Sequence, residues 1–245
     1  MIDLLAAEWL KLRTTRLVAG MLAIASALAV AAVTGAALAW SRDGRPLATT
    51  EGLRHVLPVT GTGAIVVLLV GVMLTAGEHR HGTAIDTFLT TPRRGRVAMA
   101  KLAVAGLVGV VAGVVTSAAA VAAAAIVFRA KDTTFPFGDG EVWRIVAGAV
   151  AYATLFAILG AAIGLVVRNQ VLAVAGALTW IGIVEHILVN LAPAVGRWLP
   201  TAAGQAMVRT PLDDLLAPLP AAALLATYAV VLTAAGIRFV ATQDV

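Results

Sequence analysis

The sequence predicts an all-α integral membrane protein with six transmembrane helices. Of the 245 residues, 60% are hydrophobic and only 13% are charged, and the mean hydropathy is +0.95. Apolar residues also gather in six separate runs that are each long enough to cross a bilayer. A soluble domain is about half apolar and about a quarter charged, so a water-soluble fold cannot hide this much apolar surface.

Six runs of about 20 apolar residues define the expected spans, because a helix must cross about 30 Å of hydrocarbon with its backbone amides paired. They cover residues 17–40, 59–76, 102–128, 145–167, 171–191 and 218–240. The first run is too long for the core of a signal peptide, so we expect it to be retained. Residues 17–245 then form a single six-span domain whose termini lie on one side.

Residues 1–16 form a separate amphipathic element before the first span. Its apolar side chains, including Trp9, share one helical face, whereas Glu8 and Lys11 lie off it. Arg13 belongs to the same element. This pattern favours a helix that lies in the membrane interface, a depth that suits Trp. The alternative is a simple extension of the first span.

The distribution of Lys and Arg predicts that both termini are cytoplasmic. Placing the termini inside assigns ten Lys and Arg residues to that side and eight to the other. Five of the ten lie between residues 78 and 101, and such dense groups near span ends resist translocation most strongly. The segment 192–217 then lies outside, and its three prolines with Trp198 and Leu199 predict short re-entrant or interfacial helices.

Several classes of chemistry are excluded by the residues that the chain lacks. It contains no Cys, which rules out disulfides, thiolate catalysis and Cys-ligated metals. The phosphate-binding pattern GxxxxGK[ST] and the zinc pattern HExxH are also absent. His79 and His81 have no evident third ligand, so we expect no metal site and no cofactor. The net charge of +5 comes from scattered Lys and Arg, which does not favour nucleic acid as a partner.

Glu185 is the strongest candidate for a polar site within a span. A carboxylate at the centre of a span costs about 2.5 to 3.5 kcal/mol, so such residues usually face the bundle interior or a water-filled path. With His186 and Asn190 nearby, Glu185 is predicted either to bind a cation or to brace the outer helices. The alternative is that it lies near the outer headgroups and pairs with an Arg such as Arg197.

Two pairs of glycines show the GxxxG spacing that allows helices to approach closely. They are Gly109 with Gly113 and Gly160 with Gly164. In spans this rich in Ala and Gly, we expect them to serve packing within the bundle.

The segment 77–101 carries a family resemblance. It reads GEHRHGTAIDTFLTTPRRGRVAMAK, and it resembles the first cytoplasmic loop of bacterial ABC exporter permeases of the type-2 class, with their G-E-x-R-x-G-T core, P-R-R and following Lys. The start EWLKLRTTR, residues 8–16, resembles the family's N-terminal connecting helix. Residues 180–200 resemble its fifth span and re-entrant segment, although His186 stands where a Pro is expected, which leaves the local kink open.

The resemblance implies the permease subunit of an ATP-driven exporter in the bacterial cell membrane, with residues 17–245 as the permease domain. A separate ABC ATPase subunit would bind ATP and Mg, and the permease would work as a homodimer or heterodimer. A short cytoplasmic coupling helix over residues 83–90, ended by Pro92, is expected to dock this ATPase. The expected docking residues are Glu78, Arg80, Gly82, Thr83, Thr87, Pro92, Arg93 and Arg94.

Two other functions stay open at this stage. A membrane-embedded binding or immunity factor would sequester a peptide or lipid without transport. An ion-coupled carrier would use Glu185 and need no ATPase.

Overall fold

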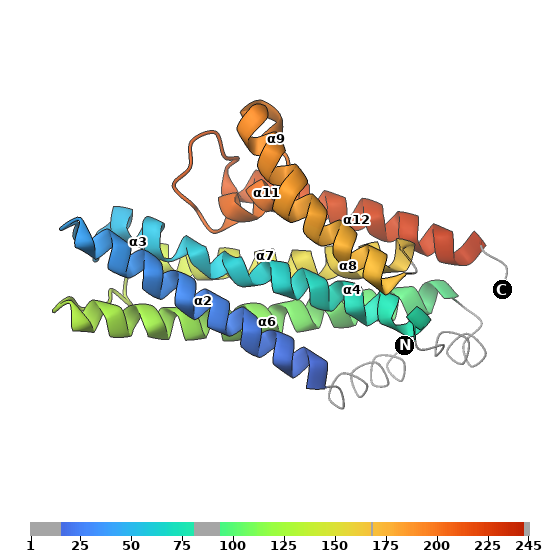
Figure 1. Cartoon of the computed structure of the whole chain (residues 1–245), viewed down its shortest axis with the longest axis horizontal. Helices are drawn as coiled ribbons and strands as arrows, with labels where there is room; N and C mark the ends of the chain where they lie inside the picture. Colours follow the sequence, from blue (N-terminus) through green and yellow to red (C-terminus); the bar gives the residue numbers. More distant parts are fainter. Residues whose placement is uncertain (1–15, 81–93, 168, 243–245) are drawn as a thin grey trace.

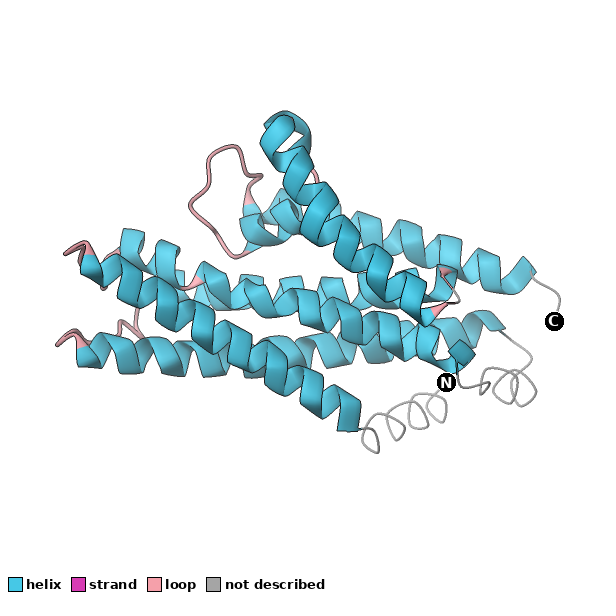
Figure 2. Cartoon of the chain, in the orientation of Figure 1, coloured by secondary structure: helices cyan, strands magenta, loops and turns pink. Residues whose placement is uncertain are grey.

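The computed structural model describes residues 16–80, 94–167 and 169–242, and every regular element in these ranges is helical (Figure 2). Six helical segments are long and apolar enough to cross a membrane. The predicted all-α membrane fold is thereby confirmed. The predicted coupling helix over residues 83–90 lies outside the described residues, as does the predicted interfacial helix over residues 1–16 apart from Arg16, with which α2 begins.

The elements follow one another as shown in Figure 1. Four spans are single helices: α2 (Arg16–Arg42), α6 (Arg94–Ala130), α7 (Gly140–Val166) and α12 (Pro218–Thr242). The second span combines α3 (Thr50–Val56), the 3-10 turn η1 (Pro58–Gly63) and α4 (Ala64–Arg80). The fifth combines α8 (Gln170–Thr179), the π turn η2 (Trp180–Val184) and α9 (Glu185–Leu191), and two short helices follow it, α10 (Pro193–Gly196) and α11 (Pro200–Met207).

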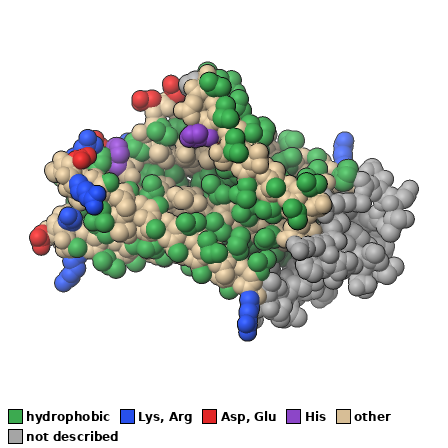
Figure 3. Space-filling view, in the orientation of Figure 1, with side chains coloured by type: hydrophobic (Ala, Val, Ile, Leu, Met, Phe, Trp, Pro, Cys, Tyr) green, Lys and Arg blue, Asp and Glu red, His purple; other side chains and the backbone are tan. Residues whose placement is uncertain are grey.

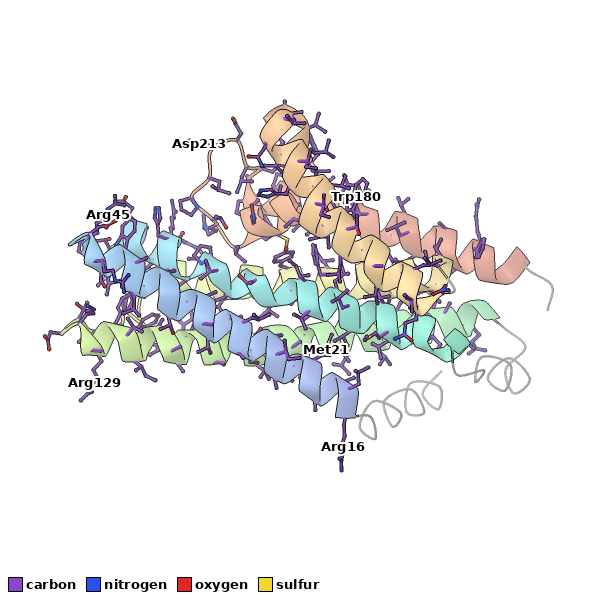
Figure 4. All side chains as sticks on the ribbon, in the orientation of Figure 1. Arg16, Met21, Arg45, Arg129, Trp180 and Asp213 are labelled. Atoms are coloured by element: carbon purple, nitrogen blue, oxygen red, sulfur yellow. The ribbon has the colours of Figure 1, made fainter. Side chains whose placement is uncertain are left out.

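In the space-filling view, charged side chains gather at one end of the described bundle, and apolar side chains cover most of its middle (Figure 3). We call the end where α4 stops and α6 and α8 start the terminal end, because α12 also ends there. The opposite end, where α2 and α6 stop and α7 starts, is the distal end (Figure 1). Arg45 and Arg129 lie at the distal end in Figure 4.

The second span begins earlier than predicted, at Thr50 instead of residue 59. Pro58 and the glycines of η1 suggest a break, but the chain continues in helical form through a 3-10 turn. Thr49 starts α3 by accepting a hydrogen bond from the backbone N–H of Gly52 at 3.1 Å, as an N-cap does. The predicted start was wrong because a 3-10 turn tolerates Pro at its first position.

Helix α7 is the centre of the fold and packs against α4, α6, α11 and α12. The most apolar window of the second span is 72% buried and that of α7 is 61% buried, whereas those of α2 and of the fifth span are 17% buried. The described residues therefore form a tight core of α4, α6 and α7. Helices α2, α8 and α12 surround it and expose most of their apolar surface.

The contact between α4 and α7 is close enough to require glycine. A Cβ added to Gly160 would overlap the backbone carbonyl of Leu68, and one added to Gly71 would overlap backbone atoms of α7. The buried hydroxyl of Thr75 donates to the carbonyl of Ala161 at 2.9 Å across the same contact. Small residues and interhelical hydrogen bonds of this kind hold helices together where lipid leaves no hydrophobic driving force.

Glycine pairs also set the contact between α6 and α7. A Cβ on Gly109 would lie 2.6 Å from Cα of Thr154, and one on Gly113 would lie 2.8 Å from Cα of Val150. Gly164, the partner of Gly160 in the second GxxxG pair, faces α4 in the same way. The prediction that both pairs serve packing within the bundle is confirmed.

The predicted short helices after the fifth span are also present. α11 packs against both α12 and α7, with the carbonyl of Met207 against Gly148 and the ring of Tyr152 against Gly204. An added Cβ would overlap the facing atoms at both glycines. Because Gly148 lies two turns inside α7, α11 folds back from the distal end onto the bundle (Figure 1).

We predict that Gly160→Ala lowers the stability of the detergent-purified protein by about 1 to 3 kcal/mol, because the new methyl group overlaps backbone that cannot move without separating α4 from α7. The matched control is Gly35→Ala in α2, where no atom lies within 4 Å of the added Cβ. This control should be neutral or slightly stabilising, since Ala favours helix over Gly. Equal thermal unfolding midpoints for the two variants would contradict the packing account.

Candidate functional site

The π turn η2 sets the direction of Glu185. The fifth span is exposed along most of its length, with Trp180 47% and Ile183 56% exposed, yet Glu185 is only 2% exposed. A π turn holds one more residue than an α turn, so it rotates the residues that follow it. Glu185, the first residue after η2, is thereby turned toward the bundle. His186 stands where the resemblance predicts a Pro and a kink. The π turn ends just before Glu185 and changes the direction of the helix face at this place.

The carboxylate of Glu185 caps α11. Its Oε2 accepts a hydrogen bond from the backbone N–H of Thr201 at 2.9 Å. The N-cap residue of α11, Leu199, provides no side-chain acceptor, and Pro200 at the first position has no N–H to satisfy. An anion at a helix N-terminus meets unpaired N–H groups and the positive end of the helix dipole. The acid thereby joins α9 to α11, a contact that fits the alternative in which Glu185 braces the outer helices.

Other expectations about Glu185 fare differently. No ion pair joins it to Arg197 among the described residues; the Arg197 guanidinium lies 5.5 Å from the ring centroid of Trp198. The expected pairing is wrong because a backbone N–H takes the place of the Arg. His186 and Asn190 are exposed, and the Asn190 amide donates to the carbonyl of His186 within α9. Glu185 and His186 nevertheless line the same cavity, which Asn190 does not line.

Glu185 lies in the wall between two cavities. The first, which we call the apolar cavity, has a volume of about 420 Å³ and lies between α8 and α12, with Leu68 of α4 and Ile163 of α7 at its base. Trp180 and Tyr228 also line it, and Glu185 is the one acidic or basic side chain among the described residues around it. It is a largely hydrophobic pocket with one placed charge, as ligand sites often are.

The second cavity, which we call the acidic cavity, has a volume of about 250 Å³ at the distal end. Its lining includes Glu185, Asp213 and Asp214, together with Arg197 and His186. Asp213 lies in the loop between α11 and α12 (Figure 4), and acidic atoms gather over this loop in the space-filling view (Figure 3). The two cavities thus share the buried carboxylate.

A second buried carboxylate, Glu141, was not singled out from the sequence. It follows the N-cap Asp139 on α7, and its side chain is 5% exposed. Its Oε1 lies 2.7 Å from Nε of Arg54 and 3.2 Å from Nε of Arg209, and its Oε2 lies 3.5 Å from Nη1 of Arg144. Glu141 therefore ties α7 to α3 and to the loop after α11 at the distal end.

The predicted docking residues lie at or beyond the limits of the description. Glu78 and Arg80 form the end of α4 and Arg94 the start of α6, but their side chains are outside the described part. Gly82, Thr83, Thr87, Pro92 and Arg93 fall wholly outside it, as do Glu8, Trp9, Lys11 and Arg13 of the predicted interfacial helix. The described helices place both ends of segment 81–93 at the terminal end.

We predict that Glu141→Gln destabilises the distal end by about 1 to 3 kcal/mol, because it removes the negative partner of two close guanidinium groups. The thermal unfolding midpoint of detergent-purified protein measures the effect. Asp43→Asn is the control, since the Asp43–Arg45 pair is exposed and 3.9 Å apart, and such pairs contribute little. If Glu141→Gln shifts the midpoint no further than Asp43→Asn, this role of Glu141 is wrong.

Comparison with known proteins identifies the family of the chain. The family model described as "ABC-2 family transporter protein" matches residues 4–185, a range that runs from the N-terminal segment to Glu185 and includes segment 77–101. No curated protein matches the chain. The matched range is more than half of the chain and carries the motif on which the resemblance rests. The protein therefore belongs to the ABC-2 family of transporter proteins and is a multi-pass membrane permease.

Proposed function

We propose that this chain is the permease subunit of an ATP-driven exporter and that a separate ABC ATPase subunit, carrying ATP and Mg, docks on segment 77–101. The family match over residues 4–185 carries the proposal. The chain itself has no GxxxxGK[ST] sequence, so it needs a partner to hydrolyse ATP by that route. The proposed location is the bacterial cell membrane.

The fold supports this role for the docking segment. Residues 81–93 connect α4 to α6. Both helices contact α7 at glycines where an added Cβ would overlap the facing helix. A displacement of the segment therefore moves three helices together rather than bending one. Glu78, Arg80, Arg93 and Arg94 supply charges that fix the register of docking.

The charge distribution supports cytoplasmic termini. The segments at the distal end carry eight Lys and Arg and eight Asp and Glu, which cancel. The segments at the terminal end carry ten Lys and Arg and five Asp and Glu, which accounts for the whole net charge of +5. A positive end suits the anionic cytoplasmic leaflet, and it faces the compartment that contains ATP.

The exposed spans support a second permease chain as a partner, identical or different. α2 and the fifth span are largely unburied, and Ile183 and Ile187 are 56% and 49% exposed. In a membrane these surfaces meet either lipid or another span. Two permease chains with two ATPase chains would place a substrate pathway between or within the permeases.

The direct test of docking is copurification of the detergent-extracted chain with the ABC ATPase encoded by the neighbouring gene. We expect the wild type to retain the ATPase and the variant Glu78→Ala, Arg93→Ala, Arg94→Ala to lose it. The matched control removes three cations at the distal end, Arg42, Arg129 and Lys131, and should retain it.

Absence of the ATPase from folded wild-type protein would overturn the proposal. Such a result would favour a binding or immunity factor, or an ion-coupled carrier. The carrier alone predicts that Glu185→Gln abolishes transport while ATP depletion at constant ion gradients does not.

Topology has its own test, which the absence of Cys makes clean. Lys131→Cys at the distal end should react with a membrane-impermeant maleimide in right-side-out vesicles, whereas Arg96→Cys at the terminal end should react only after permeabilisation. Both side chains are exposed in the described structure. The reverse labelling pattern would invert the orientation.

A further inference from the structure

The wall that separates the apolar and acidic cavities contains the buried carboxyl group of Glu185. Its Oε2 accepts a hydrogen bond from the N–H of Thr201. No donor among the described residues reaches the buried Oε1 with standard geometry, although the side chains of Thr201 and Trp180 lie near the carboxyl group. No Lys or Arg forms a salt bridge with Glu185 in the part of the chain that the structure describes. An ammonium group would supply a positive partner as well as hydrogen-bond donors.

The surroundings of this wall favour a cation over an anion. Besides Glu185, the acidic cavity is lined by Asp213 and Asp214, and its basic side chains are Arg197 and His186. Arg209, which follows α11 in the same part of the chain, points its guanidinium to Glu141 at 3.2 Å, so its charge is already matched. An anionic headgroup at this place would meet three carboxylates.

The apolar cavity supplies a place for a hydrophobic body. Its base and walls come from α4, α7, α8, α11 and α12, and it has a volume of about 420 Å³, within the range of small-molecule sites. The indole of Trp180 and the ring of Tyr228 line it. Aromatic faces attract organic cations as well as apolar groups.

We propose that the two cavities form one binding site for an amphipathic organic cation, with its apolar body between α8 and α12 and its charged group beside Glu185 and the acidic loop. The inference rests on the proposed transport function, for which it names a substrate class. A ligand held in this way lies along a line from the apolar middle of the bundle to its distal end.

The test uses a matched pair of fluorescent probes on the purified full-length protein in nanodiscs. Dansylcadaverine joins an apolar ring system to a primary ammonium group, and its N-acetyl derivative has the same body without the charge. Dansyl fluorescence rises on transfer to an apolar site. We expect wild type to bind the cation at least about tenfold more tightly than the neutral probe, since a buried charged partner contributes more than 1.4 kcal/mol.

Three variants separate the charge from the apolar body. Glu185→Gln keeps an acceptor for the N–H of Thr201 and should reduce binding of the cation to the level of the neutral probe. Gly176→Leu fills the apolar cavity from a position with no atom within 4 Å of its Cβ, and should weaken binding of both probes. The matched control, Gly35→Leu in α2, is equally unobstructed and should change neither.

Equal affinity for the two probes, or cation binding that survives Glu185→Gln, would overturn the inference. If Glu185→Gln fails to fold, as judged by size-exclusion chromatography, the exposed pair Asp213→Asn, Asp214→Asn replaces it and should weaken only the cation. The probes need no ATPase, so failure here with successful copurification overturns this inference alone. Cation binding without copurification leaves the site in place and overturns the exporter.

Discussion

The close approach of backbones around α7 is the constraint on which the rest of the structure depends. Gly160 and Gly71 bring α7 against α4, Gly109 and Gly113 bring α6 against α7, and Gly148 brings α11 onto it. None of these contacts has room for a Cβ in its present geometry. In lipid, where apolar side chains gain little by leaving their surroundings, such packing and the Thr75 hydrogen bond supply the association energy.

Because this core is tight, its two ends are mechanically connected. At the terminal end, segment 81–93 joins α4 to α6. Toward the distal end, Glu185 caps the first turn of α11. The loop after α11 is held by the ion pair between Arg209 and Glu141. Glu141 binds a group 87 residues away, at Arg54, whereas Glu185 binds one only 16 residues further along the chain, at Thr201. Because α11 packs on α7, a displacement of the two helices relative to the fifth span would strain the hydrogen bond between Glu185 and Thr201.

The sequence predicts the features that follow from continuous patterns. Six apolar runs predict six spans, and the spacing of Gly109 with Gly113 and of Gly160 with Gly164 predicts helix packing. The start of the second span at Thr50 was not predicted, because Pro58 suggests the end of a helix. The partner of Glu185 escaped because it is a backbone N–H, which leaves no trace in residue types. Glu141 escaped because its partner Arg54 lies 87 residues away. The N-cap role of Asp139 can be predicted from the local sequence, but a long-range ion pair can be identified only from the folded structure.

The central claim is that this permease responds to ATP hydrolysis by a partner through α4 and α6. The most direct measurement is the rate of ATP hydrolysis by the ABC ATPase encoded by the neighbouring gene. The rate is measured for the ATPase alone, with this chain in nanodiscs, and with the folded Gly160→Leu variant in nanodiscs. The Leu side chain at position 160 would force α4 away from α7. The account predicts a rate that changes when the wild-type chain is present and returns toward the rate of the ATPase alone with the variant, even where the ATPase stays bound. An ATPase whose rate is unaffected by the wild-type chain would contradict it.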